Sequence, residues 1–277
     1  MSPRYFIGPA GWSYGDWTGI VYPPEVVRRR GQLAYLAQSF NLVEINNSFY
    51  RIPEPRSAAR WAGTAALRPD FRFTVKLFQG FTHERELDSR QVAAFREALA
   101  PLAEAGVLGC VLAQFPWSYR CGRAEKIHLR RVLDAFAGYP LAVEVRHGSW
   151  DVPEFFAWLR ERGVAFCNID QPVIGDSLGL TALATAPRAY LRLHGRNRAA
   201  WFAADADAAQ RYNYLYSEEE IAPLAATAET LAAGAGEVYV VTNNHYRGKA
   251  VFNALQLSRR LIPGFESPLR LTEEAVR

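Results

Sequence analysis

The chain has 277 residues, of which 49% are hydrophobic and 22% are charged, with a net charge of +4 and a pI near 9.0. This composition is typical of a folded domain with a sizeable core and excludes a disordered chain, while the charge excess is too small to require a nucleic-acid partner. The N-terminus lacks a basic segment followed by an apolar run, and no run is long enough to cross a bilayer, so we expect no signal peptide and no membrane partner.

Eight short runs rich in β-forming residues alternate with helical patterns along the chain. In chain order we predict strands at residues 5–8, 42–45, 71–76, 108–114, 141–146, 165–170, 189–194 and 238–242. Apolar residues three and four apart predict helices between them, at residues 33–40, 92–102, 127–137, 153–162, 217–233 and 248–261.

Two of these helices have a recognisable start. Asp88 or Ser89 is expected to cap the helix at 92–102, and Ser217 followed by Glu220 has the spacing of a capping box. The connection at 171–187 shows little helical periodicity.

Strict alternation of eight strands with helices predicts a single (β/α)8 barrel of the TIM type over residues 1–277. Residues 262–277 follow the last helix and are expected to pack on the outside of the barrel. A doubly wound open sheet is the alternative, but no GxGxxG pattern follows the first predicted strand.

Several predicted strands carry polar residues on one face, because side chains alternate between the two faces with a period of two. Val43 and Ile45 share one face of the second strand, and Glu44 and Asn46 share the other. The apolar face suits the helix layer, so the polar face should line the barrel lumen toward its mouth. The residues expected there are Glu44, Asn46, Lys76, Glu144, Arg146, Arg192 and His194. They form either a neutralising ion network or an active site, since catalytic groups of such barrels lie at the C-terminal ends of the strands.

The loops that follow the strands add further polar and aromatic residues. The connection at 195–217 is long for a compact domain and is expected to form a lid or binding element. Its arginines and aromatic residues suit a ligand with a phosphate or carboxylate and a flat ring, such as a nucleotide, or a sugar phosphate. Trp201 in this segment either contacts the ligand or packs the lid on the rim.

The preferred hypothesis is an enzyme that performs hydrolysis or transfer on an anionic, phosphate-containing or nucleotide-like substrate. The candidate catalytic residues are Glu44, Lys76, Glu144, His194 and His245. The candidate substrate-binding residues are Trp12, Tyr14, Asn46, Tyr50, His83, Gln114, Arg146, Asp170, Arg192, Arg196, Asn243 and Asn244. A glutamate would act as the base, a histidine as the acid, and the lysine and arginines would hold the anion.

Other chemistries remain open. Non-catalytic binding of a nucleotide or nucleic acid is the alternative from another class. The two glutamates suggest a glycosidase pair, although nearby cations would lower their pKa values and spoil a general acid. Lys76 could form a Schiff base, unless pairing with a glutamate keeps it charged. No cofactor is predicted; a divalent metal at carboxylates and histidines of the strand ends is a further alternative, without a supporting motif.

The three cysteines, Cys110, Cys121 and Cys167, have no metal-binding spacing. Two lie in apolar strand-like runs, so we expect buried free thiols and a reducing, cytoplasmic location.

Seven motifs spread over nearly the whole chain together resemble the YecE-like family, also called domain of unknown function seventy-two. They are GPAGWSYGDW, VEINNSFYRIP, FTVKLFQGFTHE, LGCVLAQFP, VEVRHGSW, LRLHGR and TNNHYRGKAVFNAL. The resemblance implies a TIM-like barrel in a family without an established activity. Likeness of that family to barrel endonucleases suggests nucleic-acid binding or phosphodiester chemistry, by analogy of fold. Glu44, Lys76, Glu144, Arg192 and His194 fall inside these motifs.

Overall fold

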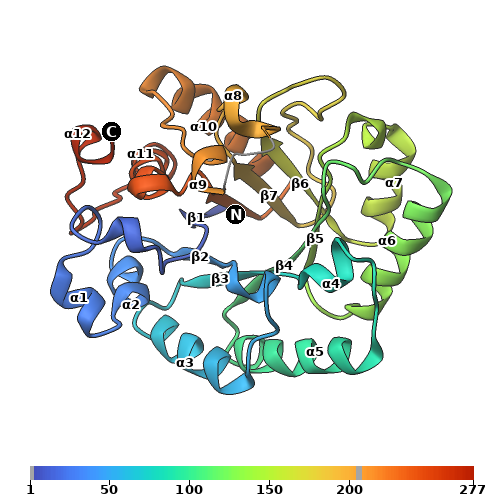
Figure 1. Cartoon of the computed structure of the whole chain (residues 1–277), viewed down its shortest axis with the longest axis horizontal. Helices are drawn as coiled ribbons and strands as arrows, with labels where there is room; N and C mark the ends of the chain where they lie inside the picture. The colour runs from blue at the N-terminus through green and yellow to red at the C-terminus, as the bar shows by residue number, and fades with distance from the viewer. Residues whose placement is uncertain (1–2, 204–207) are drawn as a thin grey trace.

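The computed structural model describes residues 3–203 and 208–277. Eight parallel strands occupy the centre, and the helices surround them (Figure 1). The strands are β1 (Arg4–Pro9), β2 (Leu42–Ile45), β3 (Arg72–Lys76), β4 (Leu108–Gln114), β5 (Leu141–Glu144), β6 (Ala165–Asp170), β7 (Arg188–Leu193) and β8 (Glu237–Thr242). Their order is β1-β8-β7-β6-β5-β4-β3-β2, which confirms the predicted TIM-like barrel.

The helices that the structure describes lie between and after these strands. They are α1 (Pro24–Arg28), α2 (Gln32–Ala37), α3 (Pro55–Ala65), α4 (Gln79–Thr82), α5 (Ser89–Glu104), α6 (Arg123–Ala135), α7 (Pro153–Glu161), α8 (Arg198–Trp201), α9 (Ala208–Arg211), α10 (Glu218–Ala233), α11 (Lys249–Leu261) and α12 (Glu273–Val276). Four 3-10 turns follow strands, namely η1 (Gly15–Trp17), η2 (Asn47–Phe49), η3 (Gly148–Trp150) and η4 (Tyr246–Gly248).

The barrel closes between β1 and β2 by a side chain instead of a regular ladder. The Asn41 amide oxygen accepts a hydrogen bond from the Ile7 N–H at 2.9 Å, and its Nδ2 donates to the Tyr5 carbonyl at 2.9 Å. Asn41 therefore satisfies the backbone of β1 where β2 has not yet begun.

At the mouth, an isolated parallel bridge between Ala10 and Glu44 completes the closure. The Gly11 N–H donates to the Glu44 carbonyl at 2.8 Å. A Cβ atom on Gly8 would lie 1.8 Å from the Leu42 carbonyl oxygen, so only glycine allows β1 and β2 to approach this closely. The nearly closed ring of strands excludes the doubly wound open sheet.

Local signals predicted several helix ends correctly. The Asp88 carboxylate caps α5 by accepting from the Gln91 N–H, and Ser217 and Glu220 form the reciprocal capping box of α10. Residues 171–187 contain no helix, as their weak periodicity indicated.

One predicted strand is too long. β5 ends at Glu144 rather than Arg146. The reason is that the Arg146 carbonyl accepts a hydrogen bond from the Leu178 N–H at 2.8 Å, so the segment after β6 takes the place of a neighbouring strand.

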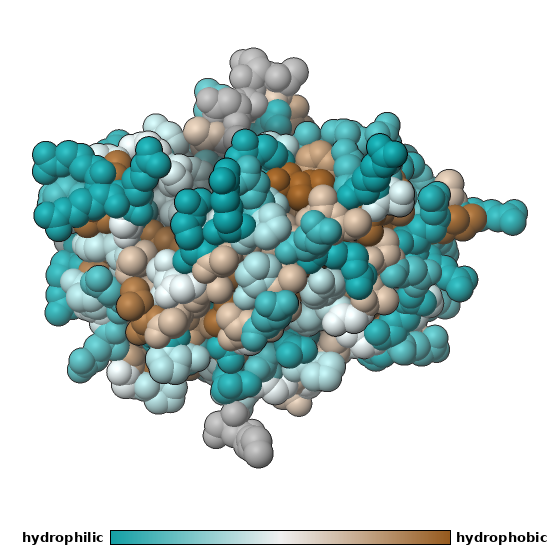
Figure 2. Space-filling model, turned by 90° about the horizontal axis from the view of Figure 1, so that it is seen from below, coloured by the Kyte–Doolittle hydropathy of each residue, from teal (hydrophilic) through white to brown (hydrophobic). Residues whose placement is uncertain are grey.

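The last residues return to the body of the domain. Leu269, Leu271 and Val276 are buried, and α12 lies beside α11 in Figure 1. Figure 2 shows the side of the molecule formed by the lower helices of Figure 1, where hydrophilic residues dominate and apolar ones form small scattered groups. No helix in the described ranges is long and apolar enough to span a membrane.

The predicted lid at 195–217 contains two one-turn helices, α8 and α9. Its residues 204–207 lie outside the described residues. Trp201 is buried, with its ring near those of His194 and Tyr212, so it packs α8 onto the barrel end.

Candidate functional site at the barrel mouth

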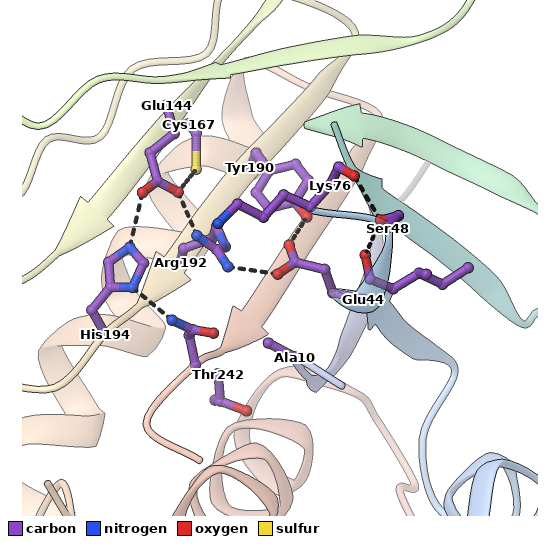
Figure 3. A network of polar contacts seen from close by, with 12 residues as sticks. Ala10, Glu44, Ser48, Lys76, Glu144, Cys167, Tyr190, Arg192, His194 and Thr242 are labelled. Atoms are coloured by element: carbon purple, nitrogen blue, oxygen red, sulfur yellow. Dashed lines mark hydrogen bonds and ion pairs between the residues drawn. The ribbon is translucent and has the colours of Figure 1, made fainter. Parts of the chain in front are cut away.

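The floor of the mouth is an arginine held between two glutamates from different strands of the barrel (Figure 3). Arg192 on β7 donates to Glu44 on β2 at 2.5 Å and to Glu144 on β5 at 2.6 Å. The Tyr190 hydroxyl donates to the second oxygen of Glu44 at 2.7 Å. Burial alone would lower the pKa of Arg192, but the two glutamates raise it well above its usual range.

The second oxygen of Glu144 holds two further groups. Arg146 Nε donates to it at 2.9 Å, and His194 Nε2 lies 3.2 Å away. Asn243 Nδ2 lies 3.0 Å from His194 Nδ1 and donates to it, which leaves the proton on Nε2 directed at Glu144. Burial lowers the pKa of His194 to about 3, so the imidazole is neutral at physiological pH.

These contacts restrict what the predicted acid and base residues can do. Glu44, Glu144 and His194 are all 0% exposed, and every carboxylate oxygen of the two glutamates accepts at least one hydrogen bond. Burial alone would raise the pKa of Glu144, but Arg192, His194 and Arg146 hold it well below its usual range. The three residues therefore orient the arginines and do not line the two hollows of the mouth described below.

Lys76 differs from the other charged residues of this layer. The Ser48 hydroxyl donates to the Lys76 carbonyl at 2.6 Å and so fixes the end of β3. The Nζ atom of Lys76 lies 3.8 Å from the centre of the Phe49 ring. Burial, Arg192 and Arg146 lower the pKa of Lys76 to about 7, against a smaller opposing effect of the glutamates.

Next to this layer lies a cavity of about 200 Å³, which we call the inner cavity. Its lining residues are Tyr14, Asn46, Phe49, Tyr50, Lys76, Arg146, Arg192, Tyr212, Asn243 and His245. The His245 ring stacks on Tyr14 at 4.4 Å between centroids. Asn46 Oδ1 and Arg192 Nε are buried and accept or donate no hydrogen bond within the described chain. Such unsatisfied atoms indicate space for a polar ligand or water.

A wider groove of about 520 Å³, the outer groove, adjoins the inner cavity and shares Phe49, Tyr50, Lys76, Arg146 and Tyr212 with it. The other lining residues are Gln79, His83, Gln114, Pro116, Trp117, Trp201, Phe202, Ala203 and Arg211.

The outer groove is rich in accessible aromatic surface. Tyr50 is 70% exposed and Phe202 is 47% exposed, and among the described residues these are the large exposed aromatic side chains. Burial lowers the pKa of His83 to about 4, so this histidine is neutral here. The groove can therefore receive the flat part of a ligand whose anion lies deeper.

Some predicted binding residues belong to other clusters. Asp170 is paired with Arg196, whose Nε lies 3.0 Å from Oδ2, and accepts from the Tyr216 hydroxyl at 2.5 Å. Asn244 donates to the Tyr214 carbonyl at 2.9 Å. Trp12 packs edge-on against another tryptophan. Four predicted binding residues therefore line neither the inner cavity nor the outer groove: Asp170, Arg196, Asn244 and Trp12.

Sequence reasoning missed several residues that complete the site. Phe49 supplies the ring under Lys76, and Tyr190 holds Glu44. Tyr190 shares the strand face of Arg192 by the period of two, so that signal was present in the sequence. The contact of Phe49 depends on the 3-10 turn after β2, for which the sequence has no comparable signal.

Within residues 3–203 and 208–277, no three histidine, cysteine, aspartate or glutamate side chains lie close enough together to hold a metal ion. The carboxylates and histidines considered for such a site are divided between the Glu144–His194 pair and the Asp170–Arg196 cluster, while His245 stacks on Tyr14.

Comparison with known proteins gives a consistent result. The sequence model described as "Protein of unknown function DUF72" matches residues 6–274. UPF0759 protein YunF of Bacillus subtilis is 30% identical over 267 residues, which cover 91% of this chain and 93% of that protein.

Solved structures agree. A DUF72 family protein from Thermotoga maritima is 34% identical with a TM-score of 0.81, covering 93% of this chain and 99% of that one. One from Enterococcus faecalis is 28% identical with a TM-score of 0.83, covering 97% and 100%. Likeness to a D-psicose 3-epimerase, at 10% identity and a TM-score of 0.50, extends to the barrel fold alone. The matches span nearly the whole chain, which therefore belongs to the DUF72 family.

Proposed function

We propose that this protein is an enzyme that binds an anionic, phosphate-containing or nucleotide-like substrate at the barrel mouth and catalyses its hydrolysis or transfer. The observation that supports this most directly is the charge of the inner cavity. Three cationic residues, Lys76, Arg146 and Arg192, line it, whereas the two glutamates that balance them lie beneath the arginines with their oxygens occupied.

The arrangement suits anion binding because the donors are held in place before a ligand arrives. Glu144 fixes both guanidinium groups, and Arg192 still has an unused Nε–H in the described structure. Oriented donors in a site of low dielectric stabilise negative charge without reorganisation. Arginine also matches phosphate and carboxylate by bidentate contacts.

Lys76 is the group that we assign to proton transfer. Its pKa of about 7 lies near physiological pH, where a group can both accept and donate a proton. In this proposal Lys76 takes the acid–base role that the sequence had suggested for the glutamates and His194.

Calorimetric titration with inorganic phosphate, followed by a phosphate-release assay on phosphomonoesters and nucleotides, tests the proposal. Arg146→Met should weaken phosphate binding by at least about tenfold, the equivalent of one charge-assisted contact. Arg130→Met on the exposed face of α6 is the matched control and should bind like the unaltered protein. Absence of saturable phosphate binding, or equal binding by both variants, would refute it.

Non-catalytic binding of nucleic acid is the second candidate, supported by the exposed Tyr50 and Phe202 on the outer groove. It predicts affinity for an oligonucleotide that falls steeply with salt and weakens in Phe202→Ala. A flat salt response would exclude this candidate.

A further inference from the structure

We propose that Lys76 is a nucleophile that forms an imine with a small aldehyde or ketone carrying a phosphate or carboxylate group. The inference rests on the proposed function for the anion site formed by Arg146 and Arg192. It goes further in naming the carbonyl group as the reacting part of the substrate, and for such a substrate it makes the Lys76 amine the nucleophile instead of the proton-transfer group.

In the described part of the chain, the Lys76 amine has no carboxylate partner. Pairing with a glutamate would keep Lys76 charged and unreactive. Glu44 is occupied by Arg192 and Tyr190, and Glu144 by Arg192, Arg146 and His194. Within the described residues, Lys76 Nζ forms no ion pair with either, and its close neighbour is the Phe49 ring at 3.8 Å.

The surroundings of Lys76 favour its unprotonated amine. Burial and the positive charges of Arg192 and Arg146 disfavour the ammonium form of Lys76, and Glu144 and Glu44 oppose them only in part, so that its pKa falls to about 7. The remaining titratable groups around the inner cavity and the outer groove are Tyr14, Tyr50, His83, Arg211, Tyr212 and His245. A desolvated lysine beside another cation is a recognised form of activated amine nucleophile.

The Lys76 side chain lines the same cavity as the two arginines. Lys76 lines both the inner cavity and the outer groove, as does Arg146, while Arg192 lines the inner cavity. In Figure 3 the Lys76 side chain extends from β3 toward the Arg192 guanidinium. One small molecule can therefore place its carbonyl carbon at Lys76 Nζ and its anionic group at the arginines.

The covalent step needs no oxidant or further reactant. The unprotonated Nζ adds to the carbonyl carbon, and the C=O π electrons move to oxygen, giving a carbinolamine after proton transfer. Loss of that oxygen as water forms the C=N bond. The imine takes a proton from solvent, and the resulting cation can accept electrons from a breaking bond to the neighbouring carbon. Among the reaction types of the proposed function, this favours transfer of a carbon fragment over hydrolysis.

Reductive trapping tests the inference with the intact protein. Dihydroxyacetone phosphate and sodium borohydride are added at pH 7.5, and the lysine-containing peptides are analysed by mass spectrometry. The chain has only two other lysines, Lys126 and Lys249, which serve as internal controls. We expect labelling of Lys76 to exceed that of Lys126 by about tenfold or more. Unphosphorylated dihydroxyacetone should label Lys76 less, and Arg146→Met should reduce that difference.

The outcomes separate the two proposals. Equal labelling of the three lysines, or none at Lys76, would overturn the imine. If phosphate nevertheless binds in an Arg146-dependent way, the proposed anion site stands without it. If phosphate does not bind, both fail. Lys76→Arg puts a permanent positive charge in place of the amine. Its melting temperature shows whether the variant is folded, and it should lose the label.

Discussion

Removing Arg192 should destabilise the protein strongly, because it would leave buried carboxylates without their main counter-ion. Arg192 is 1% exposed and contacts Glu44 at 2.5 Å and Glu144 at 2.6 Å. In Arg192→Met, Glu144 keeps Arg146 and His194, but Glu44 keeps only the Tyr190 hydroxyl. Breaking a buried pair from one side costs about 3–5 kcal/mol. For a chain of this size that corresponds to a fall in melting temperature of roughly 10 °C.

Urea unfolding followed by circular dichroism measures the loss, and a second variant tests its cause. Adding Glu44→Gln to Arg192→Met removes the uncompensated charge, so the double variant should be more stable than Arg192→Met by about 1–3 kcal/mol. A loss below about 1 kcal/mol for the single variant, or no recovery in the double variant, would refute the counter-ion argument.

Three further predictions concern the fold and its pH dependence. Gly8→Ala should destabilise the protein by about 1–3 kcal/mol or more, because the new Cβ would lie 1.8 Å from the Leu42 carbonyl oxygen. Gly63→Ala is the matched control: a Cβ there meets nothing within 4 Å, so the variant should stabilise α3 by about 0.5–1 kcal/mol in the same denaturation assay. The pKa of Lys76 is about 7 in the folded state against 10.5 in the unfolded state, so the unfolded state binds more protons between these two pH values. The free energy of unfolding should therefore rise with pH across this window, and Lys76→Met should lack that rise. The pKa of His194 is about 3 against 6.5, so stability should fall as the pH drops from 6.5 toward 3, and denaturation of His194→Gln should show a shallower fall.

The barrel was predictable because strand and helix periodicities differ and repeat eight times. The closure between β1 and β2 was not, because it depends on the Asn41 side chain and on a glycine whose need is set by the Leu42 carbonyl, 34 residues away in sequence from Gly8. Such contacts across the ring leave no periodic signal in either segment.

For the site, too, one part was predictable from the sequence and another was not. Alternation along single strands predicted that Glu44, Lys76, Glu144 and Arg192 face the lumen, and the structure brings them together there. Their pairing was not predictable, since either glutamate could have held the lysine. The proposed chemistry depends on that pairing, because Arg192 contacts both carboxylates and the Lys76 amine lines the inner cavity without a carboxylate partner in the described residues.

Asp170 and Arg196 illustrate a different limit. Both follow strand ends, which favoured a role in binding, yet they form a bidentate pair reinforced by Tyr216. A strand-end position indicates where a charged residue lies, but its partner determines whether it is available to a ligand.

The central claim, a cationic inner cavity that binds an anion beside Lys76, is tested most directly by calorimetry of sulfate binding at pH 8 in buffers of different ionisation enthalpy. Sulfate does not titrate at this pH, so any proton uptake comes from the protein. An anion near Lys76 should raise its pKa from about 7 and produce uptake of roughly 0.5–1 proton per bound ion, which Lys76→Met should abolish. Absence of saturable binding, or the same uptake in Lys76→Met, would contradict the account.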